Sequence, residues 1–131
     1  DFIQVGDMHA MPFEDNSFDI VIGGWVLAYS ADNRKAASEI LRVARPAAHI
    51  AIGCATEPVD ETAAFDRAKT ATGGVLAKTA DGSKTMSIFF NTDQILRLFE
   101  GHIDSVLFRQ DPHPQQQHER ANVTVIFRLR A

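Results

Sequence analysis

Residues 18–24 read Phe-Asp-Ile-Val-Ile-Gly-Gly, and this stretch decides the fold. The β-branched residues at its centre are typical of a sheet strand, and the two glycines end that strand. Apolar residues at helical spacing then predict a helix over about 32–44, with Ser30 or Asp32 as its cap. A further strand is predicted over 49–54. A strand, a helix and a second strand in this order indicate a parallel α/β unit.

The other elements follow from the same patterns. We expect strands at 2–5, 86–90, 102–109 and 121–130, helices at 25–29 (one turn), 60–69 and 91–100, and loops at 7–17, 71–84 and 111–120. The last two strands are joined without a helix, so they are predicted to pair antiparallel. The sequence contains no internal repeat and no linker, which predicts a single domain over 1–131.

The composition excludes several classes of protein. The chain has 131 residues, of which 45% are hydrophobic and 23% charged, and this excludes global disorder. The net charge of −4 and the lack of a basic stripe argue against nucleic acid as a partner. No apolar run reaches the roughly 18 residues that a membrane helix needs. The single cysteine excludes an internal disulfide or a thiolate metal cage and favours a cytoplasmic setting.

Three stretches in a fixed order carry a resemblance to a known family. They are Val5-Gly6-Asp7-Met8-His9-Ala10-Met11-Pro12-Phe13, then Asp15-Asn16-Ser17-Phe18-Asp19-Ile20-Val21-Ile22, then Glu39-Ile40-Leu41-Arg42-Val43-Ala44-Arg45-Pro46. Together they resemble the class I S-adenosylmethionine-dependent methyltransferases, in particular the small-molecule branch. The resemblance is strong over 5–53 and only topological beyond. It implies a Rossmann-like, mostly parallel sheet with an antiparallel C-terminal strand pair, as part of a methyltransferase fold.

The resemblance also implies a ligand and its contacts. Ligands of open α/β sheets lie beyond the carboxyl ends of the strands. The resemblance implies that Asp7 and Met8 line the adenine of S-adenosylmethionine, that Gly23 lies near its methionine part, and that Trp25 and Tyr29 face a small-molecule substrate. The expected activity is methyl transfer by the complete protein, with no catalytic base assigned and no metal.

Each of these residues also has a purely structural interpretation. Asp7 can simply cap the following turn, and Trp25 and Tyr29 can serve packing alone. His9 is a weak candidate for a general base, because it lies near the expected adenine rather than the methyl group. Cys54 is expected to be a buried strand-end residue.

Two further segments have a structural interpretation. His113 and His118 are expected in an exposed loop and not at a metal. The loop at 71–84 suggests a lid over a small ligand only through its flexibility.

Two departures from the family pattern matter. Ala47-Ala48 stand where the family usually has a glycine pair, so a backbone there with positive φ would be strained. The chain has no GxGxG motif, and it begins at Asp1 directly before an apolar run, so we expect a fragment.

A fragment of this kind leaves an apolar strand edge at Phe18–Ile22 without a neighbour. We expect one of three outcomes: residues 2–5 pair with that edge, two chains pair into a homo-oligomer, or a separate N-terminal segment completes the sheet. The alternative function is a non-catalytic, methyltransferase-like remnant that acts as a dimerisation or regulatory module.

Overall fold

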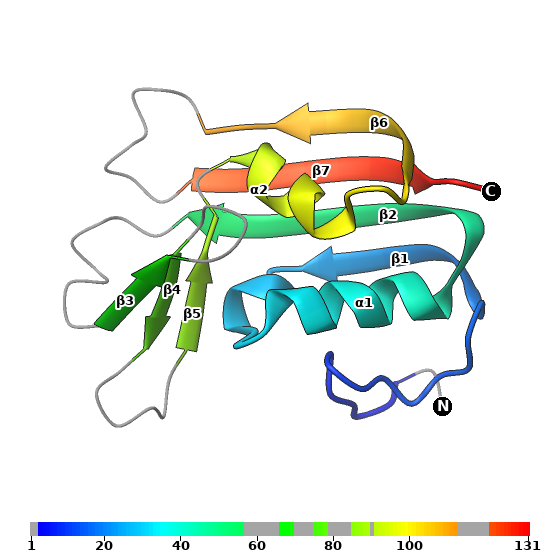
Figure 1. Cartoon of the computed structure of the whole chain (residues 1–131), viewed down its shortest axis with the longest axis horizontal. Helices are drawn as coiled ribbons and strands as arrows, with labels where there is room; N and C mark the ends of the chain where they lie inside the picture. Colours follow the sequence, from blue (N-terminus) through cyan, green and yellow to red (C-terminus); the bar gives the residue numbers. More distant parts are fainter. Residues whose placement is uncertain (1–2, 57–65, 70–74, 79–84, 90, 113–120) are drawn as a thin grey trace.

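The main sheet of the protein has four strands. In the computed structural model, which describes residues 3–56, 66–69, 75–78, 85–89, 91–112 and 121–131, the strand order is β1 (Phe18–Gly24), β2 (Ala44–Thr56), β7 (Ala121–Leu129), β6 (Ile103–Gln110) (Figure 1). β1 pairs parallel with β2, whereas the β2–β7 and β7–β6 pairs are antiparallel. The α/β class and the antiparallel C-terminal strand pair are thus confirmed.

Two helical segments cover one face of this sheet (Figure 1). A 3-10 turn, η1 (Val26–Tyr29), leads from β1 to α1 (Asn33–Val43), and α2 (Thr92–Leu96) continues into the 3-10 turn η3 (Arg97–Phe99). Both helices begin at a side-chain cap: the Asp32 side chain, one of the two predicted caps, accepts a hydrogen bond from the Lys35 amide, and the Asn91 side chain accepts one from the Gln94 amide.

The core lies between these helices and the sheet. It is formed by alternate residues of β2 and β7, by the apolar side of α1, and by Phe89 and the segment 91–99. Its largest fully buried side chains are Phe89, Phe99, Phe127, Leu27, Ile50, Ile52, Ile95, Val43, Val123 and Val125. The rings of Phe99 and Phe127 pack with centroids 4.9 Å apart.

The opposite face of the sheet carries an apolar row. The register aligns Ile22 of β1 with Ala51 of β2, Ala51 with Ile126 of β7, and Ile126 with Phe108 of β6. Residues aligned in this way lie on one face, and their sequence neighbours Ile52, Val125 and Phe127 point to the core. Ile22 is 76% exposed and Phe108 47%, so the described residues leave both ends of the row uncovered.

A second, smaller sheet was not expected. It has three antiparallel strands, β3 (Asp66–Lys69), β4 (Val75–Lys78) and β5 (Thr85–Ile88). β5 packs against η1, and Figure 1 shows the small sheet beside the carboxyl ends of β1 and β2. The three strands of this small sheet lie between β2 and α2 in the chain.

Three expectations about elements were wrong in part. Residues 3–5 form no strand, and Val5 is fully exposed, because no neighbouring strand is available to pair with them. The helix expected over 60–69 is contradicted by β3, and the loop expected over 71–84 contains β4. Residues 113–120, with His113 and His118, lie outside the described residues.

Candidate cofactor site

The carboxyl ends of β1 and β2 are joined at Trp25. Its amide donates a hydrogen bond of 2.6 Å to the carbonyl oxygen of Gly53, directly after β1 ends at Gly24. This closure requires Trp25 to adopt a φ of 58°, a left-handed conformation that is costly for a bulky side chain. Strained backbone of this kind is frequent at ligand sites.

Gly23 lies inside this closure. It is buried, and a Cβ at this position would lie 3.0 Å from Cγ1 of Val26. Trp25 and Tyr29, in contrast, are 43% and 65% exposed, on either side of the fully buried Leu27. The two aromatic side chains are therefore available at this end of the sheet, and they do not belong to the core.

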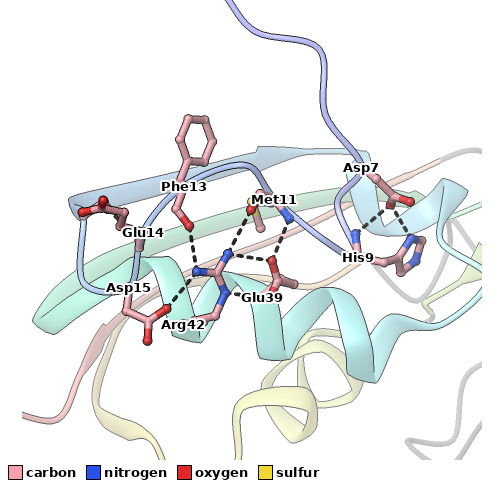
Figure 2. A network of polar contacts seen from close by, with 9 residues as sticks. Asp7, His9, Met11, Phe13, Glu14, Asp15, Glu39 and Arg42 are labelled. Carbon is pink, nitrogen blue, oxygen red and sulfur yellow. Dashed lines mark hydrogen bonds and ion pairs between the residues drawn. The ribbon is translucent and has the colours of Figure 1, made fainter.

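Asp7 is connected to the same end of the sheet through His9. Asp7 Oδ1 accepts a hydrogen bond of 2.8 Å from the His9 amide and lies 2.8 Å from His9 Nδ1 (Figure 2). The other ring nitrogen, His9 Nε2, lies 2.7 Å from Oγ of Ser30, which directly follows η1. Both ring nitrogens are thus engaged, and Asp7 and the end of β1 lie at one rim of the molecule.

The Asp7 carboxylate is held in its ionised form. Hydrogen bonds from the His9 amide and the His9 ring lower the pKa of Asp7 below its ordinary value. Its side chain is 68% exposed, and within the described part of the chain Oδ2 accepts no hydrogen bond. One carboxylate oxygen therefore remains an open acceptor for an amino group.

A clamp formed by Glu39 and Arg42 fixes the loop that carries Asp7. The Glu39 carboxylate accepts a hydrogen bond of 2.7 Å from the Met11 amide and binds the Arg42 guanidinium (Figure 2). Arg42 donates to the carbonyl oxygens of Met11 and Phe13 and to the Asp15 carboxylate. These charge-assisted bonds hold 11–15 against α1, so the preceding turn has a fixed position.

The other candidate residues have less prominent places. Met8 is half-buried and packs against the core, which leaves its backbone and part of its side chain beside Asp7. Cys54 is fully buried, as expected, and burial raises the pKa of its thiol to about 12.

The described residues contain no cluster of side chains suited to a metal ion. Among them, no helix has both the length and the apolar character needed to cross a membrane.

Sequence reasoning missed the partners of Asp7. The sequence predicts Ser30 only as an alternative helix cap, whereas Asp32 caps the helix. The sequence-based predictions also do not include the binding of Glu39 and Arg42 of α1 to the loop that carries Asp7. The Glu-x-x-Arg spacing on one side of the helix was a signal, since residues three apart lie side by side.

Comparison with known proteins finds a family match over part of the chain. Residues 2–52 match a family model described as a methyltransferase domain. A comparison with curated proteins finds no match.

Solved structures share the fold. The [4+2]-cyclase SpnF aligns with a TM-score of 0.64 and 16% identity, over 98% of this chain and 56% of that one. A SAM-dependent methyltransferase from Methanosarcina mazei aligns with a TM-score of 0.58 and 14% identity, over 97% of this chain and 66% of that one. An S-adenosylmethionine-dependent methyltransferase from Mesorhizobium loti aligns with a TM-score of 0.60 and 12% identity, over 94% of this chain and 67% of that one. The chain thus spans 56 to 67% of the lengths of these structures.

The family match covers the first part of the chain, whereas the shared fold covers nearly all of it. The family match includes Asp7, Met8, Gly23, Trp25 and Tyr29, and the shared fold extends through β6 and β7. The resemblance to the class I S-adenosylmethionine-dependent methyltransferases is therefore confirmed, by a family match over residues 2–52 and by fold over the described remainder.

Proposed function

We propose that this chain forms the adenine- and methyl-facing part of an S-adenosylmethionine site, in a methyltransferase that acts on a small molecule. The observation that carries the proposal is the convergence of Asp7 with the carboxyl end of β1 through the Asp7–His9–Ser30 contacts. In open α/β sheets this rim is where ligands bind. The family match over residues 2–52 supports a methyl donor as the ligand.

The residues present fit an adenosyl group. Asp7 offers an open carboxylate oxygen, which suits the exocyclic amino group of adenine, and the Met8 backbone lies next to it. The missing side chain of Gly23 lets Val26 pack closely against the end of β1, and we place the sulfonium end of the ligand beyond this end. When bound, S-adenosylmethionine supplies an activated methyl group.

Substrate recognition is proposed for the exposed aromatic side chains. Trp25 and Tyr29 offer flat apolar surfaces with polar tips, which suit an organic acceptor of small size. Methyl transfer is an in-line displacement, in which alignment of the two reactants provides much of the rate. A site that orients the acceptor therefore needs no dedicated base, and none is assigned here.

Titration calorimetry with S-adenosylmethionine tests the proposal. We expect the 131-residue chain to bind with a dissociation constant below about 100 µM, equivalent to roughly 5.5 kcal/mol. Asp7→Asn replaces an acceptor by a donor at the adenine position and should weaken binding by about tenfold. Asp104→Asn, which changes an exposed carboxylate on β6 in the same way, is the matched control and should leave binding unchanged.

Two results would contradict the proposal. The first is the absence of binding at millimolar concentrations of ligand. The second is binding that responds equally to the substitutions at Asp7 and Asp104, because it would place the adenosyl group elsewhere.

The alternative function is a non-catalytic module that pairs with a second chain or with a separate segment. The exposure of Ile20 (62%) and Ile22 (76%) on the edge strand β1 favours it. Light scattering after size exclusion measures the mass over a range of concentrations. A dimer without ligand binding would support the module, whereas a monomer at every concentration would contradict pairing of two copies.

The fold of SpnF, a cyclase, shows that this architecture also serves chemistry other than methyl transfer.

A further inference from the structure

The hydrogen bonds between Asp32 and Asp7 run in one direction. An ionised carboxylate can only accept, so His9 Nδ1 carries the hydrogen that it shares with Asp7 Oδ1. In the neutral ring, Nε2 is then an acceptor, and the Ser30 hydroxyl donates to it across 2.7 Å. Ser30 Oγ in turn accepts the Asp32 amide at 3.1 Å. Every donor in this chain of contacts thus points toward Asp7.

The middle of this chain is rigidly held. Ser30 is fully buried, and its own carbonyl oxygen accepts a hydrogen bond of 2.9 Å from the buried Ser87 of β5. The Asp32 amide belongs to the N-cap of α1, so the chain starts at a fixed backbone group. The imidazole of His9 is consequently fixed by groups from η1, α1 and the small sheet, although Asp7 itself lies at the surface.

The same three residue types form nucleophilic triads in hydrolases, and that role does not fit here. A serine nucleophile must reach its substrate, whereas the side chain of Ser30 has no exposed surface. Ser30 Oγ also accepts a hydrogen bond from the Asp32 amide. The exposed residue in this chain of contacts is Asp7, so a ligand would contact its carboxylate.

We propose that His9, fixed by Ser30, is a positioning residue that orients the Asp7 carboxylate so that its Oδ2 faces the adenine amino group. This inference rests on the proposed function, because it assigns the means by which the adenine contact is made selective. The Nδ1–H group occupies Oδ1 and leaves Oδ2 as the acceptor. Without the ring, the exposed carboxylate would rotate among its rotamers, and binding would have to order it.

Two substitutions at His9 separate positioning from packing. The side-chain amide of asparagine places a donor near Nδ1, whereas that of glutamine places one near Nε2. We expect His9→Asn to keep the affinity for S-adenosylhomocysteine within about threefold, and His9→Gln and His9→Ala to weaken it by about five- to tenfold. Thermal unfolding of all three variants checks that each is folded. A packing role predicts instead that the larger glutamine is tolerated best.

Nitrogen NMR of the His9 ring provides a test that needs no ligand. The positioning role requires the Nδ1–H tautomer with an unprotonated Nε2 in the neutral ring, and the Nε2–H tautomer would overturn it. In calorimetry, equal affinities of wild type and His9→Ala, with Asp7→Asn still weakened, would overturn this inference and leave the proposed function standing. No binding by the wild-type chain would overturn both.

Discussion

Ala47 adopts a backbone conformation that normally belongs to glycine. Its φ is 65°, and its amide donates a hydrogen bond of 3.0 Å to the carbonyl oxygen of Arg130. The family pattern has a glycine pair at 47–48, and the strain predicted from its replacement is confirmed at Ala47. A left-handed residue with a Cβ costs roughly 1–2 kcal/mol. The irregular backbone near the start of β2 is thus retained at the expense of stability.

Ala47→Gly should therefore stabilise the protein. The relief of strain exceeds the entropy that glycine adds to the unfolded chain, and we expect the free energy of unfolding to rise by about 0.5–1 kcal/mol. Urea denaturation measures it. Ala48→Gly is the control, because Ala48 is buried in β2 and its substitution should be destabilising. A loss of stability in both variants would show that the turn gains nothing from glycine.

At the scale of elements, the clamp between α1 and the preceding loop has a pH dependence. Hydrogen bonds from Arg42 and from the Met11 amide lower the pKa of Glu39 from 4.5 to about 2. In the unfolded chain the carboxyl titrates near its ordinary value, so its contribution to stability is fully present above about pH 4.5. This contribution is lost as the pH falls toward 2, when the folded protein must also take up the proton.

Glu39→Gln should remove this part of the acid sensitivity. At pH 7 we expect a decrease in Tm of a few degrees, and near pH 2 the difference from wild type should nearly vanish. Thermal unfolding between pH 7 and pH 2 tests this expectation. Glu100→Gln is the matched control, because it makes the same change at an exposed residue after η3. A constant difference between Glu39→Gln and wild type over this range would contradict the assignment.

The elements that could be predicted are those whose sequences carry local signals. α1 has an apolar side and a cap, and Asn91 with Gln94 identifies the start of α2. β3 could not be predicted, because Asp66–Lys69 has no alternating apolar pattern and is extended only through pairing with β4. Local propensity contains no information about such a partner.

The candidate site could be predicted in the same limited way. The motif around Asp7 predicted it at the end of a strand, and residues 3–5 form no strand, but contacts through His9 and Ser30 still connect Asp7 to the segment that follows β1. The contact between His9 and Ser30 joins residues 21 positions apart. It depends on how η1 turns the chain back, which no spacing in the sequence specifies.

At the scale of the whole molecule, the exposed strand β1 should govern association. Of the segment expected to pair with this edge, residues 3–5 do not do so, and Ile20 and Ile22 are left uncovered by the described residues. A double substitution, Ile20→Lys with Ile22→Lys, places charges along the edge and should disfavour pairing. We expect wild type to gain mass with concentration in light scattering, and the variant to remain a monomer.

Leu107→Lys on β6 is the matched control for that experiment. It places a charge on the opposite edge of the sheet, where the wild-type leucine is 56% exposed. Association that is lost equally in both variants would contradict a specific role of β1.

The position of β7 between β2 and β6 determines the order in which the protein can assemble. During synthesis both outer neighbours leave the ribosome before the strand that joins them. Until Ala121–Leu129 emerges, β6 has no partner and the inner edge of β2 stays open. The inner edge of β2 therefore stays open while residues 57–120 are synthesised, and we expect the nascent chain to depend on chaperones at this stage more than a sheet built from sequential hairpins would.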